Sequence, residues 1–498
     1  MVIRTYPQGS GDDWGSASVG RSPSDPPGRP LSVVVLAAGH GTRMHSDRPK
    51  PLHRLCGRPM ILHVLDALAE LPVDRVVVVV GHGADAVTAA LQDVRTDIPI
   101  EFVEQRVQRG TGDATSVALT AFSDTVDDDD VIVCSADIPL LRAESLATLA
   151  TEHRLADAAA TLLTAVLDDP TGYGRIVRDG RGNVERIVEQ SDASPDELAV
   201  TEVNPSIYCF RRAFLAPALR RVSPENAQGE YYLTDVVEVL RSAGHAVLAV
   251  PAPDPTETLG VNDRAQLADA ESILRRRINI AWMRAGVTIV DPAHTYIDTT
   301  VELAADVRLL PGTILEGRTT VATGAVLGPD TRLVDTAVGE GASIEASVAR
   351  GAEVGPDVHV GPFAHLRPGT RLARDARVGS FVETKNADIG EGAKLPHLSY
   401  VGDAEVGAGA NVGAGTITAN YDGRAKHRTR IGANARTGSN SVLVAPVELG
   451  AGAYTGAGAV VTRDVPPDSL AIGVPAKIVE GWVKARDDTD DAGDAGEH

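Results

Sequence analysis

The stretch Val406-Gly-Ala-Gly-Ala-Asn-Val412-Gly-Ala-Gly-Thr416 places a branched residue every six positions, with small residues between them. The same spacing recurs from Ile297 to Val461. A period of six matches neither the 3.6-residue period of an α-helix nor the two-residue alternation of a simple strand. It is typical of a hexapeptide β-helix, in which each six-residue unit supplies one short strand and one corner. We therefore expect a solenoid over this part of the chain.

The repeat positions share a branched side chain, which we expect to point into the coil while Gly and Ala fit the corners. They are Ile297, Leu303, Leu309, Leu315, Val321, Leu327, Leu333, Val338, Ile344, Val354, Val360, Leu366, Leu372, Val378, Ile389, Leu395, Val401, Val406, Val412, Ile431, Thr437, Leu443, Leu449, Thr455 and Val461. A Gly/Ala-rich segment of low complexity would not keep this phase for so long.

Composition narrows the class of protein. A chain of 498 residues exceeds a single core and allows about two or three domains. The net charge of -21 argues against nucleic-acid and membrane partners, and the Asp127–Asp130 run is predicted to be a solvated loop. Cys56, Cys134 and Cys209 are far apart without CxxC spacing, which predicts free thiols and a cytoplasmic location.

Residues 31–258 alternate strand-like and helix-like runs. This alternation predicts a parallel sheet with crossover helices, a Rossmann-like α/β domain. The expected strands are Leu31–Ala38, Arg75–Val80 and Val131–Ser135, and the expected helices are Met60–Glu70, Ala84–Gln92 and Thr115–Phe122. A linking helix is expected within 259–284, over Leu259–Ile280, and the solenoid domain over 285–482. Residues 1–30 and 483–498 are predicted to be disordered extensions, the second of them acidic.

The first expected strand ends in a glycine loop, Leu36-Ala-Ala-Gly39-His-Gly41-Thr-Arg43-Met44, followed by Pro49-Lys50. Open α/β sheets bind ligands at this edge, where glycines let the backbone approach phosphates that Arg43 and Lys50 can neutralise. The loop is neither a GxGxxG fingerprint nor a P-loop, and its glycines alone would equally suit a turn. The whole string resembles the signature of the sugar-1-phosphate nucleotidyltransferases.

This resemblance continues in order through the domain and implies a nucleotide and sugar site. The residues it assigns to binding are Leu36, Ala37, Ala38, Gly39, Lys50, Gln105, Gln108, Gly110, Thr111, Ser135, Asp137, Gly174, Glu189, Asn204 and Asn262. Asp137 and Asn262 would hold Mg2+ with oxygen donors. Arg43 and Lys50 would be catalytic, stabilising negative charge as a sugar phosphate attacks the α-phosphorus of a nucleoside triphosphate.

Each of these residues also has a structural interpretation. Asp137 could cap a turn, Glu189 could be a solvated charge, and Asn204 before a proline could belong to a turn. Their joint order along one domain favours the functional interpretation. The chain departs from many relatives at Ala136, where a methyl group replaces a glycine hydrogen beside Asp137.

Polar residues interrupt the solenoid in a second group, at Arg367, at Lys385, and from His397 to Tyr400, before a loop over 418–430 breaks the repeat. With about eighteen residues per coil, Arg367 and Lys385 should lie one above the other on one face. The spacing leaves the direction of His397 open.

This group resembles the acetyltransferase half of the bifunctional N-acetylglucosamine-1-phosphate uridyltransferase/glucosamine-1-phosphate acetyltransferases, and the resemblance covers about residues 31–482. It implies that His397 is the general base, a role that suits a neutral imidazole. It assigns Arg367, Lys385, Tyr400 and Asn411 to the acceptor sugar phosphate, and Ala414, Asn420, Tyr421, Ser439, Ala457 and Lys477 to acetyl-CoA. Lys477 stands near the place of the family's arginine at the CoA phosphate.

The implied function is synthesis of UDP-N-acetylglucosamine, a precursor of peptidoglycan and other cell-envelope polymers. Acetyl-CoA would acetylate glucosamine-1-phosphate, and UTP would then uridylylate N-acetylglucosamine-1-phosphate, with Mg2+ as cofactor and a homotrimer as the assembly. One alternative is a nucleotidyltransferase and an acyltransferase of other specificity. Another is a binding protein whose solenoid serves only assembly, although that interpretation predicts no catalytic histidine.

Overall fold

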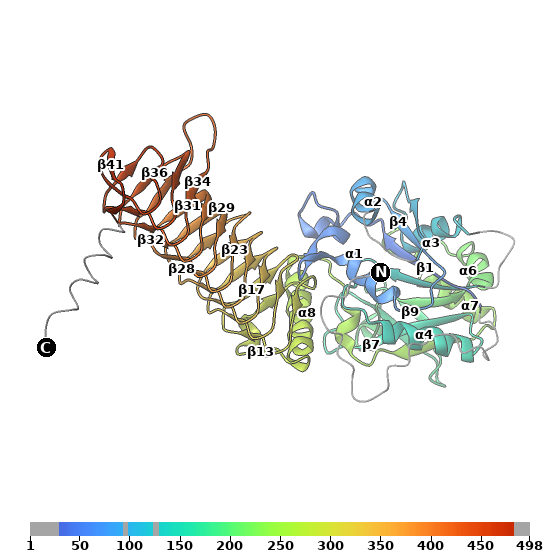
Figure 1. The fold of residues 1–498 in the computed structure, drawn as a ribbon. Coiled ribbons are helices and arrows are strands. Elements are labelled where there is room, and N and C mark those ends of the chain that lie inside the picture. Colours follow the sequence, from blue (N-terminus) through green and yellow to red (C-terminus); the bar gives the residue numbers. More distant parts are fainter. Residues whose placement is uncertain (1–28, 93–97, 123–128, 483–498) are drawn as a thin grey trace. The chain divides into compact units, whose positions relative to one another are not determined.

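The computed structural model describes residues 29–92, 98–122 and 129–482 (Figure 1). The chain forms two compact units that divide between Leu274 and Arg275. The predictions of disorder for residues 1–30 and 483–498 lie outside the described residues except at Arg29 and Pro30, and Arg29 is hydrogen-bonded to Asp130.

The first unit is built on a mixed sheet of order β5-β4-β1-β6-β11-β7-β10-β8-β9, with β12 pairing β7. Strands β5, β4, β1 and β6 are parallel, as predicted, whereas β11 runs antiparallel to both β6 and β7. The strands are β1 (Leu31–Ala37), β4 (Arg75–Val80), β5 (Ile100–Glu104), β6 (Asp130–Ser135), β7 (Ala160–Val166), β8 (Gly174–Arg178), β9 (Val184–Val188), β10 (Glu202–Asn204), β11 (Tyr208–Arg211) and β12 (Val247–Pro251), with a small hairpin of β2 (Arg54–Leu55) and β3 (Arg58–Pro59).

Helices cover both faces of this sheet (Figure 1). Val33 and Val35 of β1 pack in a buried cluster with α1, α2 and α4, whereas Val34 packs in a second cluster with α3, α6 and α7. Burial on both faces explains why these strands are continuous apolar runs. The helices are α1 (Met60–Leu68), α2 (Ala84–Gln92), α3 (Thr111–Leu119), α4 (Ala143–Leu155), α5 (Pro195–Leu198), α6 (Arg212–Leu219), α7 (Asp235–Ser242) and α8 (Arg264–Arg284), with short 3-10 turns η1 (Thr42–Met44), η2 (Lys50–Leu52), η3 (Pro255–Thr258) and η4 (Pro292–His294).

The predicted boundaries of α2 match the structure, whereas α1 ends at Leu68 and not at Glu70, and α3 and α8 are shifted at both ends. Helix α3 begins at Thr111 and not at Thr115, because Gly110, with φ 105°, turns the chain immediately before it. Helix α8 begins at Arg264, later than the expected Leu259. No helix in the described ranges is long and apolar enough to cross a membrane.

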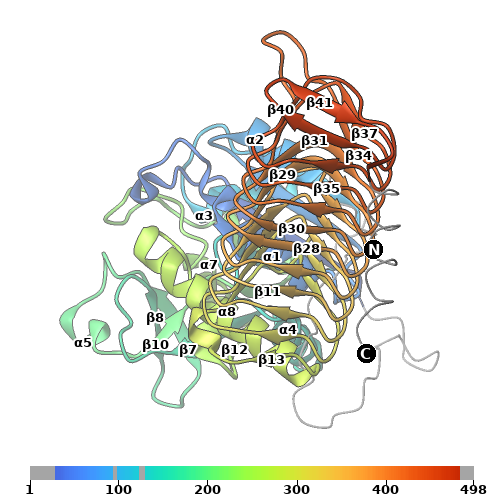
Figure 2. The same ribbon diagram turned by 60° about the vertical axis from the view of Figure 1, so that its left-hand side comes forward.

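The second unit is a left-handed parallel β-helix (Figure 2). Strands pair with the strand one coil later, so that Tyr296 lies beside Ile314 and Glu302 beside Thr320, which gives the predicted eighteen-residue coil. Every predicted inward residue is buried, the most exposed being Leu303 at 8 %. The six-residue period therefore identified the interior of the coil correctly.

Two sheets make up the described walls of this β-helix. One contains β13 (Thr288–Ile289), β16 (Arg308–Leu309), β19 (Val326–Leu327), β22 (Ser343–Ile344), β25 (His359–Val360), β28 (Arg377–Ser380), β30 (Lys394–His397), β32 (Asn411–Val412), β35 (Arg436–Thr437), β38 (Tyr454–Thr455), β40 (Leu470–Gly473) and β41 (Ala476–Val479). The other contains β14 (Tyr296–Ile297), β15 (Glu302–Leu303), β17 (Ile314–Glu316), β18 (Thr320–Val321), β20 (Arg332–Val334), β21 (Ala337–Val338), β23 (Val348–Arg350), β24 (Glu353–Val354), β26 (His365–Leu366), β27 (Arg371–Leu372), β29 (Glu383–Ile389), β31 (Tyr400–Val406), β33 (Ile417–Ala419), β34 (Thr429–Ile431), β36 (Val442–Val444), β37 (Val447–Leu449) and β39 (Val460–Val461).

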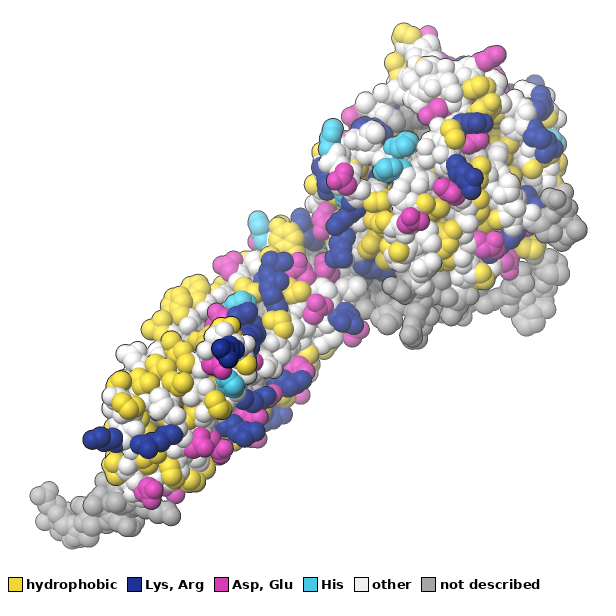
Figure 3. Space-filling view, turned by 90° about the horizontal axis from the view of Figure 1, so that it is seen from above, with side chains coloured by type: hydrophobic (Ala, Val, Ile, Leu, Met, Phe, Trp, Pro, Cys, Tyr) yellow, Lys and Arg dark blue, Asp and Glu magenta, His cyan; other side chains and the backbone are white. Residues whose placement is uncertain are grey.

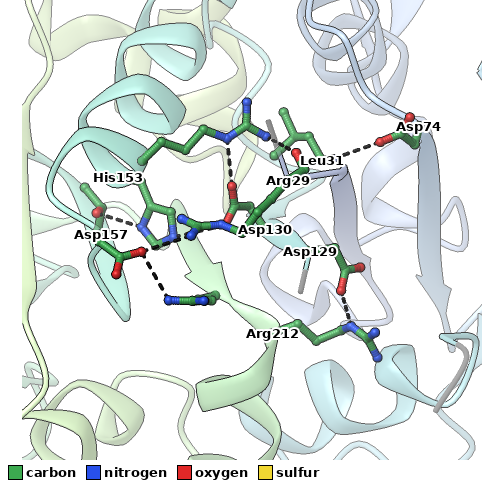
Figure 4. A network of polar contacts seen from close by, with 11 residues as sticks. Arg29, Leu31, Asp74, Asp129, Asp130, His153, Asp157 and Arg212 are labelled. Atoms are coloured by element: carbon green, nitrogen blue, oxygen red, sulfur yellow. Dashed lines mark hydrogen bonds and ion pairs between the residues drawn. The ribbon is translucent and has the colours of Figure 1, made fainter. Parts of the chain in front are cut away.

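The prediction of a solvated Asp127–Asp130 loop is wrong for the two residues of this run that the structure describes. Asp129 is 6 % exposed and Asp130 is fully buried at the start of β6 (Figure 4). Asp130 accepts hydrogen bonds from Arg29 Nε at 2.9 Å and Arg154 Nε at 2.7 Å, and Asp129 pairs with Arg212. Basic partners from distant parts of the chain make burial of these carboxylates possible. Cys56, Cys134 and Cys209 are free and buried, as predicted for the thiols.

Candidate active sites

A cavity of about 430 Å³ opens at the carboxyl edge of β1 and β6. All the residues that the first resemblance singled out line this one cavity. They are Leu36, Ala37, Ala38, Gly39, Arg43, Lys50, Gln105, Gln108, Gly110, Thr111, Ser135, Asp137, Gly174, Glu189, Asn204 and Asn262. The parallel strands β1, β5 and β6 bring the first of these segments together because their carboxyl ends meet at one edge of the sheet. Gly174, Glu189 and Asn204 come instead from the antiparallel part of the sheet, at β8, β9 and β10.

Lys50 occupies the centre of the charged part of this cavity. Its ammonium is hydrogen-bonded to Asn262 Oδ1 at 2.8 Å and forms a short ion pair with Asp137. Gly41, with φ 61°, precedes η1, and a Cβ atom there would lie 2.8 Å from Lys50 Cβ. A side chain at position 41 would therefore crowd Lys50.

The oxygen atoms around the Lys50 ammonium are suitable ligands for a divalent cation. Oxygens of Asp137 and Asn262 converge on one ammonium group, so the same two atoms can face one metal ion when Lys50 turns to a phosphate. In the described residues there is no cluster of three or more His, Cys, Asp or Glu side chains that could hold a metal. Two protein oxygens are enough for Mg2+, which keeps several waters and binds phosphate oxygens.

The opposite wall of the cavity carries hydroxyl, amide and carboxylate groups suited to a sugar. Burial raises the pKa of Glu189, which accepts a hydrogen bond from Thr234 Oγ1 at 3.2 Å. Asn204 donates to the Tyr208 hydroxyl at 2.8 Å, and the Tyr173 hydroxyl accepts from the Gly260 amide at 3.1 Å. Tyr173 and Thr234 were not predicted from the sequence, because a tyrosine or threonine in a loop belongs to no recognisable motif by itself.

The remaining wall is organised by Gln105, which is 3 % exposed and donates to Asp113 at 2.8 Å. Gln108 donates to the Gln105 carbonyl at 3.3 Å. Ala136 is 1 % exposed and packs in the buried cluster beside α4, so its methyl group presents almost no surface to the cavity. The departure from glycine at this position leaves the approach to Asp137 open.

On the β-helix, Arg367 directly follows β26 and Lys385 lies within the paired strand β29, since Leu366 lies beside Thr384 and the Arg367 amide donates to the Thr384 carbonyl. They lie one coil apart, as expected. Arg367 pairs with Glu383 at 2.8 Å, and Glu383 lies beside Tyr400 on the next coil.

The loop after β33 adds a second ammonium group to this surface. Contact with Lys385 lowers the pKa of Lys426. Asp403, below this pair, accepts from Asn386 at 2.7 Å and from Asn420 at 2.5 Å. Two ammonium groups in contact favour an anion between them. Lys426 was not predicted as a site residue because it lies in a loop that interrupts the repeat.

His397 ends β30, and Ser380 lies beside it on the preceding coil. Its side chain is exposed, at the corner three residues before Tyr400. No hydrogen bond or ion pair joins its imidazole to Arg367 or Lys385 among the described residues. Asn411 begins β32 beside Lys394, the first residue of β30. The repeat spacing left the direction of the His397 side chain open. In the structure this side chain points outward from a corner, next to β31, the strand that begins with Tyr400.

The residues assigned to acetyl-CoA lie on the following coils. Ala414, Ser439 and Ala457 occupy one corner on three successive coils, since Val412 lies beside Thr437 and Thr455 follows one coil later. Tyr421 is 61 % exposed at the loop, and Asn420 is buried against Asp403. Lys477 is exposed on β41, in a hairpin with β40 that closes the β-helix.

Comparison with known proteins places both halves in one family. A model described as the MobA-like NTP transferase domain matches residues 33–243, and one described as bacterial transferase hexapeptide (six repeats) matches residues 428–463. Proteins named Bifunctional protein GlmU from Streptomyces coelicolor and Brevibacillus brevis are 51 % and 50 % identical, covering 91 % and 89 % of this chain and 94 % of each relative. The one from Mycolicibacterium vanbaalenii is 49 % identical over 91 % of this chain and 93 % of its own. The chain belongs to the GlmU family.

Members of the GlmU family are bifunctional enzymes of UDP-N-acetylglucosamine synthesis, and both catalytic units are present in this chain. The mixed α/β unit is the nucleotidyltransferase half, and the hexapeptide β-helix is the acetyltransferase half. The expectation of a bifunctional enzyme is confirmed, and the interpretation of the solenoid as a mere assembly module is excluded.

Proposed function

We propose that the cavity at the edge of β1 and β6 transfers UMP from UTP to N-acetylglucosamine-1-phosphate, with Mg2+ held by Asp137 and Asn262. The convergence of Asp137 and Asn262 on the Lys50 ammonium carries this proposal. Bound Mg2+ would supply positive charge to the phosphates. The glycine loop offers backbone N–H groups to the same phosphates.

The chain's own residues position the reaction. Arg43 and Lys50 neutralise the phosphate oxygens as the sugar phosphate attacks the α-phosphorus and pyrophosphate leaves. Glu189 and Asn204 hydrogen-bond the sugar hydroxyls and amide from the opposite wall. Gln105 and Gln108 face the base, where two amide groups can meet the donors and acceptors of uracil.

We also propose that the surface around Lys385 binds glucosamine-1-phosphate for acetyl transfer. Arg367, Lys385 and Lys426 hold its phosphate, and the contact between the two lysines carries this assignment. The His397 imidazole takes a proton from the sugar amine as the amine attacks the thioester of acetyl-CoA. The small-residue corner of Ala414, Ser439 and Ala457 admits the pantetheine arm, and Lys477 meets the CoA phosphates.

We infer a homotrimer from an apolar stripe beside His397. Phe363, Phe381 and Leu398 are 59 %, 61 % and 63 % exposed at one corner of successive coils, and the two phenylalanine rings stack with centroids 5.4 Å apart. Figure 3 shows apolar side chains gathered over parts of the solenoid surface between charged groups. Exposed aromatic side chains in such a row mark an interface. A neighbouring copy on this stripe would complete the acetyltransferase site.

The same proposal divides the chain into a nucleotidyltransferase domain over 31–258, a linking helix over 259–284 and an acetyltransferase domain over 285–482. UTP and acetyl-CoA are cytoplasmic metabolites, so we place the enzyme in the cytoplasm. Nucleic acid and membrane are absent from the proposed partners because of the net charge of -21.

One coupled assay tests the whole proposal. The purified chain receives glucosamine-1-phosphate, acetyl-CoA, UTP and Mg2+, and free thiol and pyrophosphate are followed separately. We expect thiol release from the first two substrates alone, and pyrophosphate release that requires both the acetylated sugar and Mg2+. Pyrophosphate release with another nucleotide or another sugar phosphate in preference would overturn the substrate assignment. Substituting Phe363 and Phe381 with Ser should yield a smaller species by light scattering, with acetyl transfer lost and uridylyl transfer retained.

A further inference from the structure

Two histidines face each other beside the nucleotide cavity. His40 lies in the glycine loop after β1 and lines the cavity, and His82 lies in the loop after β4. Their ring centroids are 5.4 Å apart and the planes are tilted by 44°. Strands β1 and β4 are parallel neighbours, so the two loops leave the same edge of the sheet.

The backbone fixes His82 against the glycine loop. The His82 amide donates to the Ala38 carbonyl at 3.4 Å. A Cβ atom on Gly81 would lie 2.7 Å from both the Ala38 oxygen and Gln108 Nε2, and Gly83, with φ 72°, packs on Pro49. Because glycines on both sides of His82 allow this close packing, the backbone at His82 is held against the glycine loop.

The basic side chains in the described lining of the cavity are His40, Arg43 and Lys50. Lys50 is already hydrogen-bonded to Asp137 and Asn262. A nucleoside triphosphate brings several negative charges into this space, and charge-assisted hydrogen bonds to phosphate are the strong ones. His40, as a third cationic side chain in this lining, can therefore also bind phosphate, a role that has not yet been assigned to it.

We propose that His40, as the imidazolium, binds the β- or γ-phosphate of the incoming nucleotide, and that His82 is a positioning residue that holds the His40 ring. This inference rests on the assignment of the cavity to UTP made above. It makes nucleotide binding depend on pH, because only the imidazolium form carries the charge that pairs with phosphate.

The surroundings decide when the proton is taken up. Titratable side chains on the flanking segments are Arg43, His45, Asp47, Arg48, Lys50 and Asp85, more of them basic than acidic. The charge of a bound triphosphate favours the imidazolium form of His40. Nucleotide binding is thus linked to proton uptake, and the KM for UTP should rise as pH rises.

The experiment measures pyrophosphate release by the full-length enzyme at pH 6, 7 and 8, with saturating Mg2+ and N-acetylglucosamine-1-phosphate. For H40Q we expect a KM for UTP roughly tenfold above wild type at pH 6, with a smaller change at pH 8 and little change in kcat. The matched variant H40K carries a permanent charge and should combine a low KM with a flatter pH dependence. H82Q should shift the wild-type dependence along the pH axis. Comparison between variants removes the titration of UTP itself.

Two controls separate the possible failures. Thiol release by each variant, compared with wild type at the same pH, shows that the acetyltransferase unit is intact, and a thermal unfolding curve matched to wild type shows that the nucleotidyltransferase unit is folded. Lys50→Ala tests the cavity assignment. Wild-type KM and wild-type pH dependence in H40Q, with uridylyl transfer lost in the Lys50 variant, would overturn the inference about His40 alone. Unchanged kinetics in the Lys50 variant as well would overturn the assignment of the cavity. Unchanged behaviour of H82Q would remove its positioning role.

Discussion

The ammonium of Lys50 lies 2.8 Å from the amide oxygen of Asn262, a residue 212 positions later in the chain. The first residue stands beside the glycine loop, and the second stands just before α8. Asp137, at the end of β6, shares the same ammonium. A cation is therefore held at the point where three segments of the nucleotidyltransferase unit meet.

Substitution of Lys50 with Ala should abolish most uridylyl transfer and leave acetyl transfer unchanged. Removing one preorganised cation from a phosphoryl transition state costs about 10²–10³ in rate. Lys50→Arg, which keeps the charge but changes its geometry, should retain part of the activity. Pyrophosphate and thiol release measured on one preparation check this prediction. Equal loss of both products would mean that the variant is misfolded and not catalytically impaired.

Asp137→Ala and Asn262→Ala should each raise the Mg2+ concentration needed for half-maximal pyrophosphate release. Each substitution removes one oxygen ligand, and the carboxylate should matter more because it carries a charge. The check is a Mg2+ titration at fixed UTP for both variants and wild type. Thr234→Ala, which removes the hydrogen bond to Glu189 on the opposite wall, is the control: it should alter the KM for the sugar phosphate and keep the wild-type Mg2+ requirement. Unshifted titrations in both ligand variants would contradict the metal assignment.

The solenoid could be predicted closely because its signal is repeated and local. Each inward side chain reports the same environment, so an error at one position does not move the others. The prediction of a solvated Asp127–Asp130 loop failed because the environment of Asp130 is not local in sequence. Its partners are Arg29 and Arg154, and only the fold brings them to this carboxylate. A run of acidic letters carries no information about such distant cations.

The sites divide in the same way. Glycines, lysine and aspartate in fixed order mark the phosphate side of the cavity, whereas Tyr173 and Thr234 on the sugar side depend on loops with no recurrent pattern. Lys426 is similar, since its contact with Lys385 depends on how the loop after β33 folds back. The order of motifs along the sequence identified the phosphate-binding residues, and the tertiary structure was needed to find the loop residues that surround them.

His397→Ala should reduce acetyl transfer by about 10²–10⁴ without changing uridylyl transfer, which is the range for loss of a general base. Lys426→Ala should instead raise the KM for glucosamine-1-phosphate with a smaller effect on kcat. A KM effect alone from His397→Ala would assign this residue to binding.

Burial lowers the pKa of His63 to about 4, although its ring bonds the Leu55 carbonyl at 2.9 Å. The unfolded value is about 6.5, so the native state disfavours the proton. Stability from the neutral ring is complete above pH 6.5 and is lost as pH falls towards 4. His63→Gln, whose amide can still donate to Leu55, should flatten this loss. Thermal unfolding at pH 7.5 and 5 checks the slope, with exposed His45→Gln as the control that leaves it unchanged.

Asp130→Ala should destabilise the nucleotidyltransferase unit by about 3–5 kcal/mol, because it leaves the buried His153 and the partly buried Arg29 and Arg154 without their carboxylate. Although burial opposes ionisation, hydrogen bonds from His153 and Arg154 and the charge of Arg29 lower the pKa of Asp130. This stability is present at neutral pH and is lost as pH falls through the carboxyl range.

Asp157 provides the matched control, since it accepts from Arg29 at 2.9 Å through a side chain that is 68 % exposed. Asp157→Ala should cost much less than Asp130→Ala, as for other exposed pairs. Urea unfolding followed by pyrophosphate release and by circular dichroism measures both variants. Equal small losses would mean that water reaches Asp130 and replaces its partners. A large loss for Asp130 alone would show that the two carboxylates on Arg29 differ because one of them is buried.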